Sequence, residues 1–158
     1  MKTHHYQVTN TWTGNLGKGT KDYRSYSRDH LISAQNKAHE ILGASDPAFR
    51  GDPSRYNPEE LFVASISTCH MLWFLHLCAS NKIIISSYVD KARGTMEEGV
   101  DGSGRFTQVT LYPKVIINDA SQIELANQLH EEANKMCFIA NSCNFPVLHK
   151  PITEIAVT

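Results

Sequence analysis

The sequence has almost no excess of either charge. Its 158 residues hold 15 lysines and arginines against 16 aspartates and glutamates, a formal net charge of −1. A protein that binds nucleic acid usually gathers a basic surplus on one face, so this balance argues against a nucleic-acid partner. With 41% hydrophobic and 20% charged residues, the chain has a globular composition, and its length suits a single domain over residues 1–158.

The N-terminal segment MKTHHYQVTNTW lacks the apolar run of a secretory signal peptide. We therefore expect a cytoplasmic protein, in which thiols are normally reduced and a disulfide is transient or catalytic. The four cysteines are Cys69, Cys78, Cys137 and Cys143. In a chain of this length, an even number of cysteines does not indicate a structural disulfide framework.

Common motifs for phosphate and metal binding are also missing. The segment GNLGKGT lacks the spacing of a Walker loop, so it predicts a turn. Structural zinc sites normally use close pairs such as C-x2-C, whereas Cys69 and His76, like His130 and Cys137, are seven residues apart. We expect no metal and no bound organic cofactor.

The order of predicted elements is that of an α+β protein. Strands and a glycine turn are expected in residues 5–34, an ordered loop in 43–58, and a long β-hairpin in 82–117. A second helix is predicted to open at Ser121, and ITEIAVT is predicted to form a closing strand. Apolar residues recur at helical spacing in that second helix: Ala126, Leu129, Ala133, Met136, Cys137 and Ala140.

The first helix has a clear start. Asn57 suits the N-cap, Pro58 the first helical position, and Glu60 the third position of a capping box. Residues 61–80 then carry no formal charge and are long enough to cross a membrane. Their hydroxyls and two histidines would need partners in lipid, so we predict a central helix of a water-soluble core, covered on most sides by sheet.

Cys69 lies nearly three turns inside this helix, too far from its N-terminus for the helix dipole to activate it. Plain packing is the ordinary fate of such a cysteine, and it is our expectation for Cys78 and Cys143. If Cys69 is reactive, a cation must approach it. The upstream loop offers Arg50 and Arg55.

A cysteine hydrolase is disfavoured at this position. Cys69 and His70 are adjacent on the helix, so their side chains diverge by about 100° and cannot pair as nucleophile and base. A distant histidine such as His149 is not singled out by any pattern. His70 itself is expected to be a partly buried histidine with a backbone partner.

The segment NPEELFVASISTCH, with a second cysteine 68 residues later in HEEANKMCFIANSCNFPV, resembles the OsmC/Ohr family of thiol-dependent hydroperoxide reductases. The upstream segments WTGNLGKGTKDYRSYSRDH and SDPAFRGDPSRYNPEEL resemble one OsmC-like branch of it. The resemblance implies an OsmC-like fold, with antiparallel sheets packed around a long central helix. It also implies an intertwined homodimer with two sites at the subunit interface.

The resemblance also assigns roles to residues. It implies that Cys69 is the peroxidatic cysteine, Cys137 the resolving cysteine, and Glu59 the carboxylate that holds an arginine. That arginine corresponds best to Arg50, with Arg55 as the alternative. In much of the family a proline follows the resolving cysteine, but here Phe138 follows it, and Cys143 is an alternative resolver.

The implied activity is peroxidase defence against oxidative stress. Organic hydroperoxides would be reduced to alcohols through a Cys69 sulfenate and a Cys69–Cys137 disulfide, and a dithiol donor such as a lipoyl protein would restore the thiols. Five apolar side chains are expected to favour organic hydroperoxides over hydrogen peroxide: Phe62, Met71, Leu72, Trp73 and Phe74. The alternative is a redox-silent dimeric protein that binds a small molecule.

Overall fold

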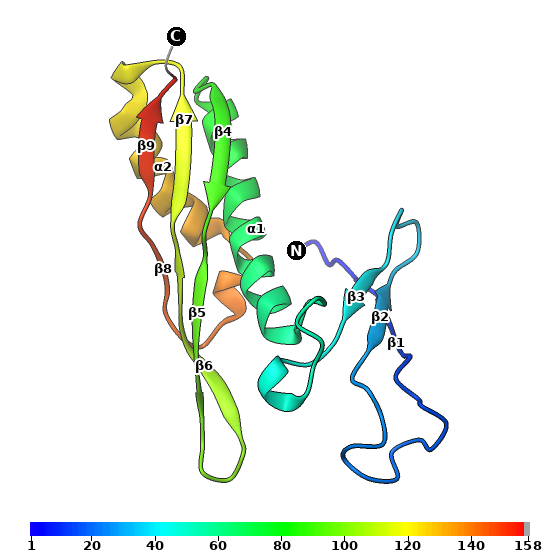
Figure 1. The fold of residues 1–158 in the computed structure, drawn as a ribbon. Coiled ribbons are helices and arrows are strands. Elements are labelled where there is room, and N and C mark those ends of the chain that lie inside the picture. Colours follow the sequence, from blue (N-terminus) through cyan, green and yellow to red (C-terminus); the bar gives the residue numbers. More distant parts are fainter. Residues whose placement is uncertain (157–158) are drawn as a thin grey trace. The chain divides into compact units, whose positions relative to one another are not determined.

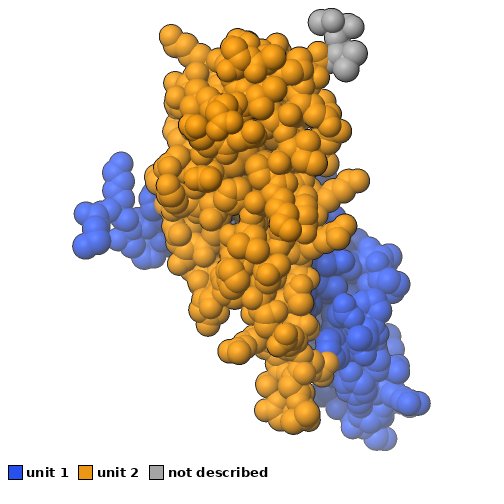
Figure 2. All heavy atoms as spheres, turned by 90° about the vertical axis from the view of Figure 1, so that its left-hand side faces the viewer, with its two compact units in different colours: residues 1–61 blue, residues 62–158 orange. Residues whose placement is uncertain are grey.

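The computed structural model describes residues 1–156, and the chain divides into two compact units, Met1–Leu61 and Phe62–Thr158 (Figure 2). The elements are a mixture of sheets and helices, including one long helix, so the predicted α+β class is confirmed (Figure 1). The description of the chain as one domain stays a prediction.

The first unit contains a small antiparallel sheet. Its strands are β1 (Thr9–Trp12), β2 (His30–Ser33) and β3 (Ile41–Gly43), in that spatial order. The first two confirm the strands expected in residues 5–34. The third was missed, because three residues are too short for an alternating pattern to be recognised. A short 3-10 turn, η1 (Pro47–Phe49), follows in the loop before the long helix.

The long helix α1 spans Pro58–Ser80. Its predicted capping box is confirmed: the Asn57 side chain accepts from the Glu60 amide at 2.7 Å, and Glu60 accepts from the Asn57 amide at 3.1 Å. By length and composition alone, α1 is the one helix among the described residues that would be able to cross a membrane.

Only one stripe of α1 is buried, made of Ile66, His70, Phe74 and Cys78. These residues recur every fourth position, as expected for one helical face. The prediction that sheet covers α1 on most sides is therefore wrong for the single chain. The helix is apolar on most of its faces, so its sequence pattern did not show which face would pack.

Up to residue 156, the second unit has six strands in two three-stranded sheets. They are β4 (Ile85–Asp90), β5 (Arg93–Glu98), β6 (Gly104–Leu111), β7 (Pro113–Ile117), β8 (Val147–His149) and β9 (Ile152–Ile155). The orders are β4-β7-β9 and β5-β6-β8. The antiparallel pairs β4–β7 and β5–β6 confirm the long hairpin, whereas β8 and β9 pair in parallel with it. The closing strand is confirmed as β9 over Ile152–Ile155, while residues 157–158 of the expected segment lie outside the described residues.

The second helix, α2, spans Ile123–Met136 and begins later than predicted. Asp119 caps a 3-10 turn, η2 (Ala120–Gln122), and its carboxylate accepts from both the amide and the hydroxyl of Ser121. Ser121 is therefore a partner of the cap and does not cap a helix itself. At the other end Met136 is exposed, because the helix stops there and the buried stripe does not continue through it.

Two apolar clusters hold the second unit together. In the first, the middle and end of α1 pack against β7 and α2, around Phe74, Val115 and Ala133. In the second, Ile66 packs against Val109 and Leu111 of β6. Both helices lie on the same side of the strands (Figure 1). This arrangement places α1, which carries Cys69, against α2, which ends at the residue before Cys137.

Candidate functional site

Cys69 and Cys137 come together in the second unit, although 68 residues separate them in the sequence. Cys69 lies half-buried on α1, and Cys137 lies fully buried directly after the last residue of α2. Both thiols are free, and Cys69 lies close enough to Cys137 to influence the pKa of the Cys137 thiol. The two thiols are therefore neighbours in the fold.

The surroundings of Cys137 keep its thiol protonated. Burial, followed by the influence of the neighbouring Cys69 side chain, raises the pKa of Cys137 to about 12. The sulfur also accepts from the Ala140 amide at 3.3 Å and lies 4.0 Å from the Ile66 carbonyl oxygen.

The other two cysteines fit structural roles. Cys78 is fully buried in the α1 stripe, and burial raises its pKa to about 12. Cys143 is half-buried, donates to the Ile139 carbonyl at 3.3 Å, and also has a pKa raised by burial. Both environments match the expected packing role.

A buried pair of histidines lies beside the thiols. His70 Nε2 and His130 Nδ1 are 3.0 Å apart, and the two rings are nearly parallel, at 6°, with their centres 5.3 Å apart. The distance between the ring centres exceeds the distance between the nitrogens by about two ring radii. The two rings therefore meet edge to edge, with the two nitrogens pointing directly at each other. This is an N–H···N bond between neutral imidazoles, in which one nitrogen donates and the other accepts.

The neighbours of this pair are mostly apolar. Phe74 stacks on the His130 ring with centres 3.8 Å apart, and the His149 ring of β8 lies 5.6 Å from that of His70. Burial lowers the pKa of His70 to about 4 and that of His130 to about 3, with the charge of the neighbouring histidines adding to the effect. The pair is therefore neutral at physiological pH.

Sequence reasoning missed this pair. His70 was expected to have a backbone partner, but it bonds to another side chain. His130 occupies a helical position next to Leu129, so periodicity places it close to the buried stripe. No local pattern reveals that two histidines 60 residues apart will meet, because that contact depends on how α1 packs against α2.

The predicted arginines lie in the first unit. Arg50 is exposed and adopts a left-handed backbone conformation with φ 66°. A Cβ on the neighbouring Gly51 would collide with the Ser45 carbonyl oxygen, so this loop closes tightly around a glycine. The guanidinium carbon of Arg50 lies 6.0 Å from the Tyr23 ring centre.

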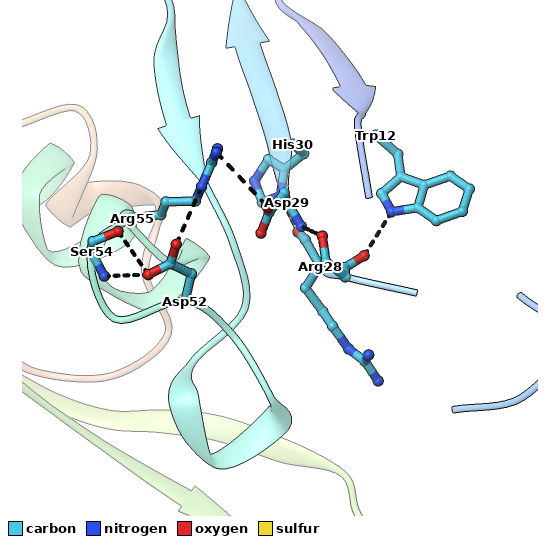
Figure 3. A network of polar contacts seen from close by, with 8 residues as sticks. Trp12, Arg28, Asp29, His30, Asp52, Ser54 and Arg55 are labelled. Carbon is cyan, nitrogen blue, oxygen red and sulfur yellow. Dashed lines mark hydrogen bonds and ion pairs between the residues drawn. The ribbon is translucent and has the colours of Figure 1, made fainter. Parts of the chain in front are cut away.

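Arg55 is more enclosed and belongs to a polar network (Figure 3). Its guanidinium lies 3.8 Å from an Asp29 carboxylate oxygen and 3.7 Å from one of Asp52, while its Nη1 is buried without a hydrogen-bond partner. Within residues 1–156 neither arginine forms an ion pair with Glu59, whose Oε2 is also buried and unpartnered. The structure of the single chain thus brings the two cysteines together, but not the arginine and the glutamate.

No group of three or more histidine, cysteine or acidic side chains in the described part of the chain is arranged to hold a metal ion. In the case of the histidines, the reason is visible in the geometry. The nitrogens of His70 and His130 that face each other already share a hydrogen bond, so no ion fits between them.

The fold and the paired thiols define a class of α+β protein with two adjacent reduced cysteines between its helices. Residues 51–150 match the family model of the OsmC-like protein, so the chain belongs to the OsmC-like family. Among curated proteins, none matches the sequence.

Several solved structures share the fold. An OsmC-like protein of unknown function from Vibrio cholerae matches with a TM-score of 0.84 and 30% identity, covering 95% of this chain and 100% of its own. An organic hydroperoxide resistance protein from Elizabethkingia anophelis, crystallised with thiocyanate bound, gives a TM-score of 0.68 at 22% identity, covering 99% and 100%. A putative organic hydroperoxide resistance protein from Vibrio cholerae, with captopril bound in one of its active sites, gives 0.62 at 20% identity, covering 96% and 93%.

Proposed function

We propose that this protein is a thiol-dependent peroxidase that reduces organic hydroperoxides to alcohols in defence against oxidative stress. The observation that carries the proposal is the contact between Cys69 and Cys137 in a chain of the OsmC-like family. The organic hydroperoxide resistance proteins among the fold relatives support the same chemistry. A pair of reduced thiols in contact can complete a two-electron cycle without a cofactor.

The proposed reaction balances in three steps. The Cys69 thiolate attacks the outer peroxide oxygen; the O–O bond breaks, the alkoxide takes a proton and leaves as an alcohol, and Cys69 becomes a sulfenic acid. Cys137 then attacks that sulfur, forming a disulfide and releasing water. A dithiol donor, such as a lipoyl protein, reduces the disulfide by thiol–disulfide exchange and is itself oxidised.

An arginine is proposed to stabilise the Cys69 thiolate and to hold the peroxide, while Glu59 grips the guanidinium. Arg50 is the first candidate. The alternative, Arg55, is supported by its buried and unpartnered Nη1, since the buried Oε2 of Glu59 also lacks a partner. Bringing an arginine to Glu59 would give both kinds of orphaned atom a partner.

Part of the expected substrate wall is available to an apolar ligand. Leu72 is exposed, and Trp73 contacts the exposed Phe138 edge-on, with ring centres 5.7 Å apart. Phe74, in contrast, is fully buried against His130, so it contributes to the core and does not line such a wall. We infer a preference for organic hydroperoxides from the remaining apolar side chains.

The exposed apolar face of α1 supports a homodimer. Only four of its 23 residues are buried, and Leu72 on the open side is 58% exposed. Leaving such a face in water is costly, and a second copy of the chain would cover it.

We expect Leu72→Glu to convert a dimer into a monomer in sedimentation velocity experiments. Ile84→Glu, at a residue that is 63% exposed outside α1, is the matched control and should stay dimeric; dimers in both variants would contradict the assignment of the interface.

The proposed cycle is tested by intact-mass analysis after one equivalent of cumene hydroperoxide. We expect a loss of about 2 Da, from two thiol hydrogens, and peptide mapping should locate the new bond between Cys69 and Cys137. In Cys137→Ser, the same treatment should instead add one oxygen at Cys69. Oxygen addition at Cys69 in the wild type, with no disulfide, would contradict the resolving role of Cys137.

The second candidate function is a redox-silent protein that binds a small molecule. The binding of a small molecule is supported by the Vibrio cholerae relative that holds captopril in one of its active sites. The two functions separate in Cys69→Ser, because the peroxidase loses turnover whereas a binding protein keeps its ligand.

A further inference from the structure

The interface between α1 and α2 contains one directional side-chain contact. Among residues 58–80 and 123–136, the His70–His130 bond is the only side-chain hydrogen bond that joins the two helices. The contacts around it are apolar, including Phe74, Ala126 and Ala133. Apolar burial is non-directional, so it holds the helices together without fixing how far one slides along the other. The hydrogen bond is directional and weakens steeply outside a narrow range of distance.

The histidine pair lowers the stability of the core relative to apolar side chains of similar size. His70 Nδ1 and His130 Nε2 are buried without hydrogen-bond partners. Whichever tautomers are present, one of these outer nitrogens carries an unsatisfied N–H and the other an unsatisfied lone pair. Two apolar side chains of similar volume would avoid both penalties. The pair therefore does not serve stability. What it provides is a defined alignment of α1 with α2.

That alignment bears directly on the thiols. His70 follows Cys69 on α1, and Cys137 follows Met136, the last residue of α2. A helix moves as a rigid body, so a slide of α2 carries Cys137 with it. Apart from its proximity to Cys69, the Cys137 sulfur contacts α1 weakly, at the Ile66 carbonyl oxygen 4.0 Å away.

We propose that His70 and His130 are positioning residues, whose hydrogen bond sets the register of α2 against α1 and thereby holds Cys137 against Cys69. The inference rests on the proposed function, since the register matters only if these thiols form a disulfide. Neither histidine needs to touch the peroxide. They act by raising the effective concentration of one thiol at the other.

The test is the equilibrium between the reduced protein and oxidised dithiothreitol, which measures that effective concentration without any peroxide. Protein dithiol and dithiothreitol disulfide exchange to protein disulfide and dithiothreitol, so two electrons and two protons move between known partners. In His70→Leu/His130→Leu, which removes both orphaned nitrogens, we expect the equilibrium constant to fall about tenfold, the usual scale of one buried hydrogen bond. The thermal unfolding midpoint of the reduced double variant should be at least as high as that of either single leucine variant.

Two further variants separate alignment from general stability. His70→Gln places an amide where His70 Nε2 lies, so it should keep the equilibrium constant within about threefold of the wild type. Cys78→Ala shortens a buried side chain on the same α1 stripe without touching the polar bond. It should lower the thermal midpoint and leave the exchange equilibrium unchanged.

The outcomes distinguish this inference from the proposed function. A wild-type disulfide together with an unchanged equilibrium in the double leucine variant would overturn the positioning role alone. So would a fall in Cys78→Ala as large as that in the double variant, because the effect would then follow stability. If one equivalent of cumene hydroperoxide forms no Cys69–Cys137 disulfide in the wild type, the resolving step fails, and the positioning role fails with it.

Discussion

Cys69→Ser is expected to abolish hydroperoxide consumption, with kcat/KM for cumene hydroperoxide falling at least about a thousandfold. A serine hydroxyl stays protonated near neutral pH and is a poor nucleophile toward a peroxide oxygen, whereas a cysteine can react as its thiolate. Cys69 is half-buried, so serine fits the site with little effect on folding. The measurement is a coupled peroxidase assay with dithiothreitol or a dihydrolipoyl donor. Turnover in Cys69→Ser above one tenth of the wild-type rate would rule out Cys69 as the nucleophile.

The remaining cysteines provide controls for this result. Cys143→Ser should keep most of the activity, because the Cys143 thiol is bonded to the Ile139 carbonyl and Cys137 is the thiol in contact with Cys69. Cys137→Ser should react with a first equivalent of peroxide and then accumulate sulfinic acid at Cys69. If Cys143→Ser loses activity and Cys137→Ser keeps it, the resolving role belongs to Cys143.

The arginine can be identified in the same assay. Lysine keeps the charge but cannot grip a carboxylate with two parallel hydrogen bonds, so Arg50→Lys should lower kcat/KM if Arg50 is the cation held by Glu59. Arg55→Lys tests the alternative. Arg93, on the exposed strand β5, is a matched control, and its lysine variant should behave as the wild type.

The elements that were predicted well from the sequence are those specified by neighbouring residues. The start of α1 depends on Asn57, Pro58 and Glu60, which contact one another within a single turn, and the capping box formed as expected. The long hairpin depends on local strand patterns and the turn between them. Local interactions of this kind are visible in sequence because they do not depend on how the rest of the chain packs.

The features that were missed depend on contacts between distant residues. The register of α1 against α2 determines that His70 meets His130, and neither neighbourhood contains a signal for it. The exposed face of α1 was misjudged for a similar reason: a helix that is apolar on most sides does not reveal which side packs within its own chain. The pairing of Cys69 with Cys137 was anticipated only through the family resemblance.

The buried histidines also make the protein sensitive to acid. In the unfolded chain each histidine has a pKa of about 6.5, whereas burial lowers that of His70 to about 4 and that of His130 to about 3. The unfolded state therefore binds more protons than the folded state below pH 6.5, and stability falls as the pH falls. The loss begins near pH 6.5 and continues to about pH 4, where the folded state begins to take up protons as well.

The size of this effect follows from linkage. Each histidine that is neutral in the folded state and charged in the unfolded state costs about 1.4 kcal/mol of unfolding free energy per pH unit. Between pH 6.5 and 4.5 the pair should therefore cost several kcal/mol, a large share of the stability of an ordinary domain. The titratable neighbour of the pair is His149 on β8, whose pKa burial also lowers, while the charge of Glu131 on α2 opposes that shift at His149. Tyr88 on β4, whose pKa is raised by burial, contacts Phe74, which itself stacks on the His130 ring.

Urea unfolding of the reduced protein between pH 7 and 4.5 measures the acid effect directly. The unfolding free energy of the wild type should fall steeply over this range, and His70→Leu/His130→Leu should lose most of that slope, because neither leucine can take up a proton. His76→Gln, at an exposed histidine of α1, is the matched control and should retain the wild-type slope. Carboxylates contribute equally to all three proteins, so the difference between the slopes isolates the buried pair. Equal slopes in the wild type and the double variant would show that these imidazoles are already charged in the folded protein, which would contradict the neutral N–H···N bond between them.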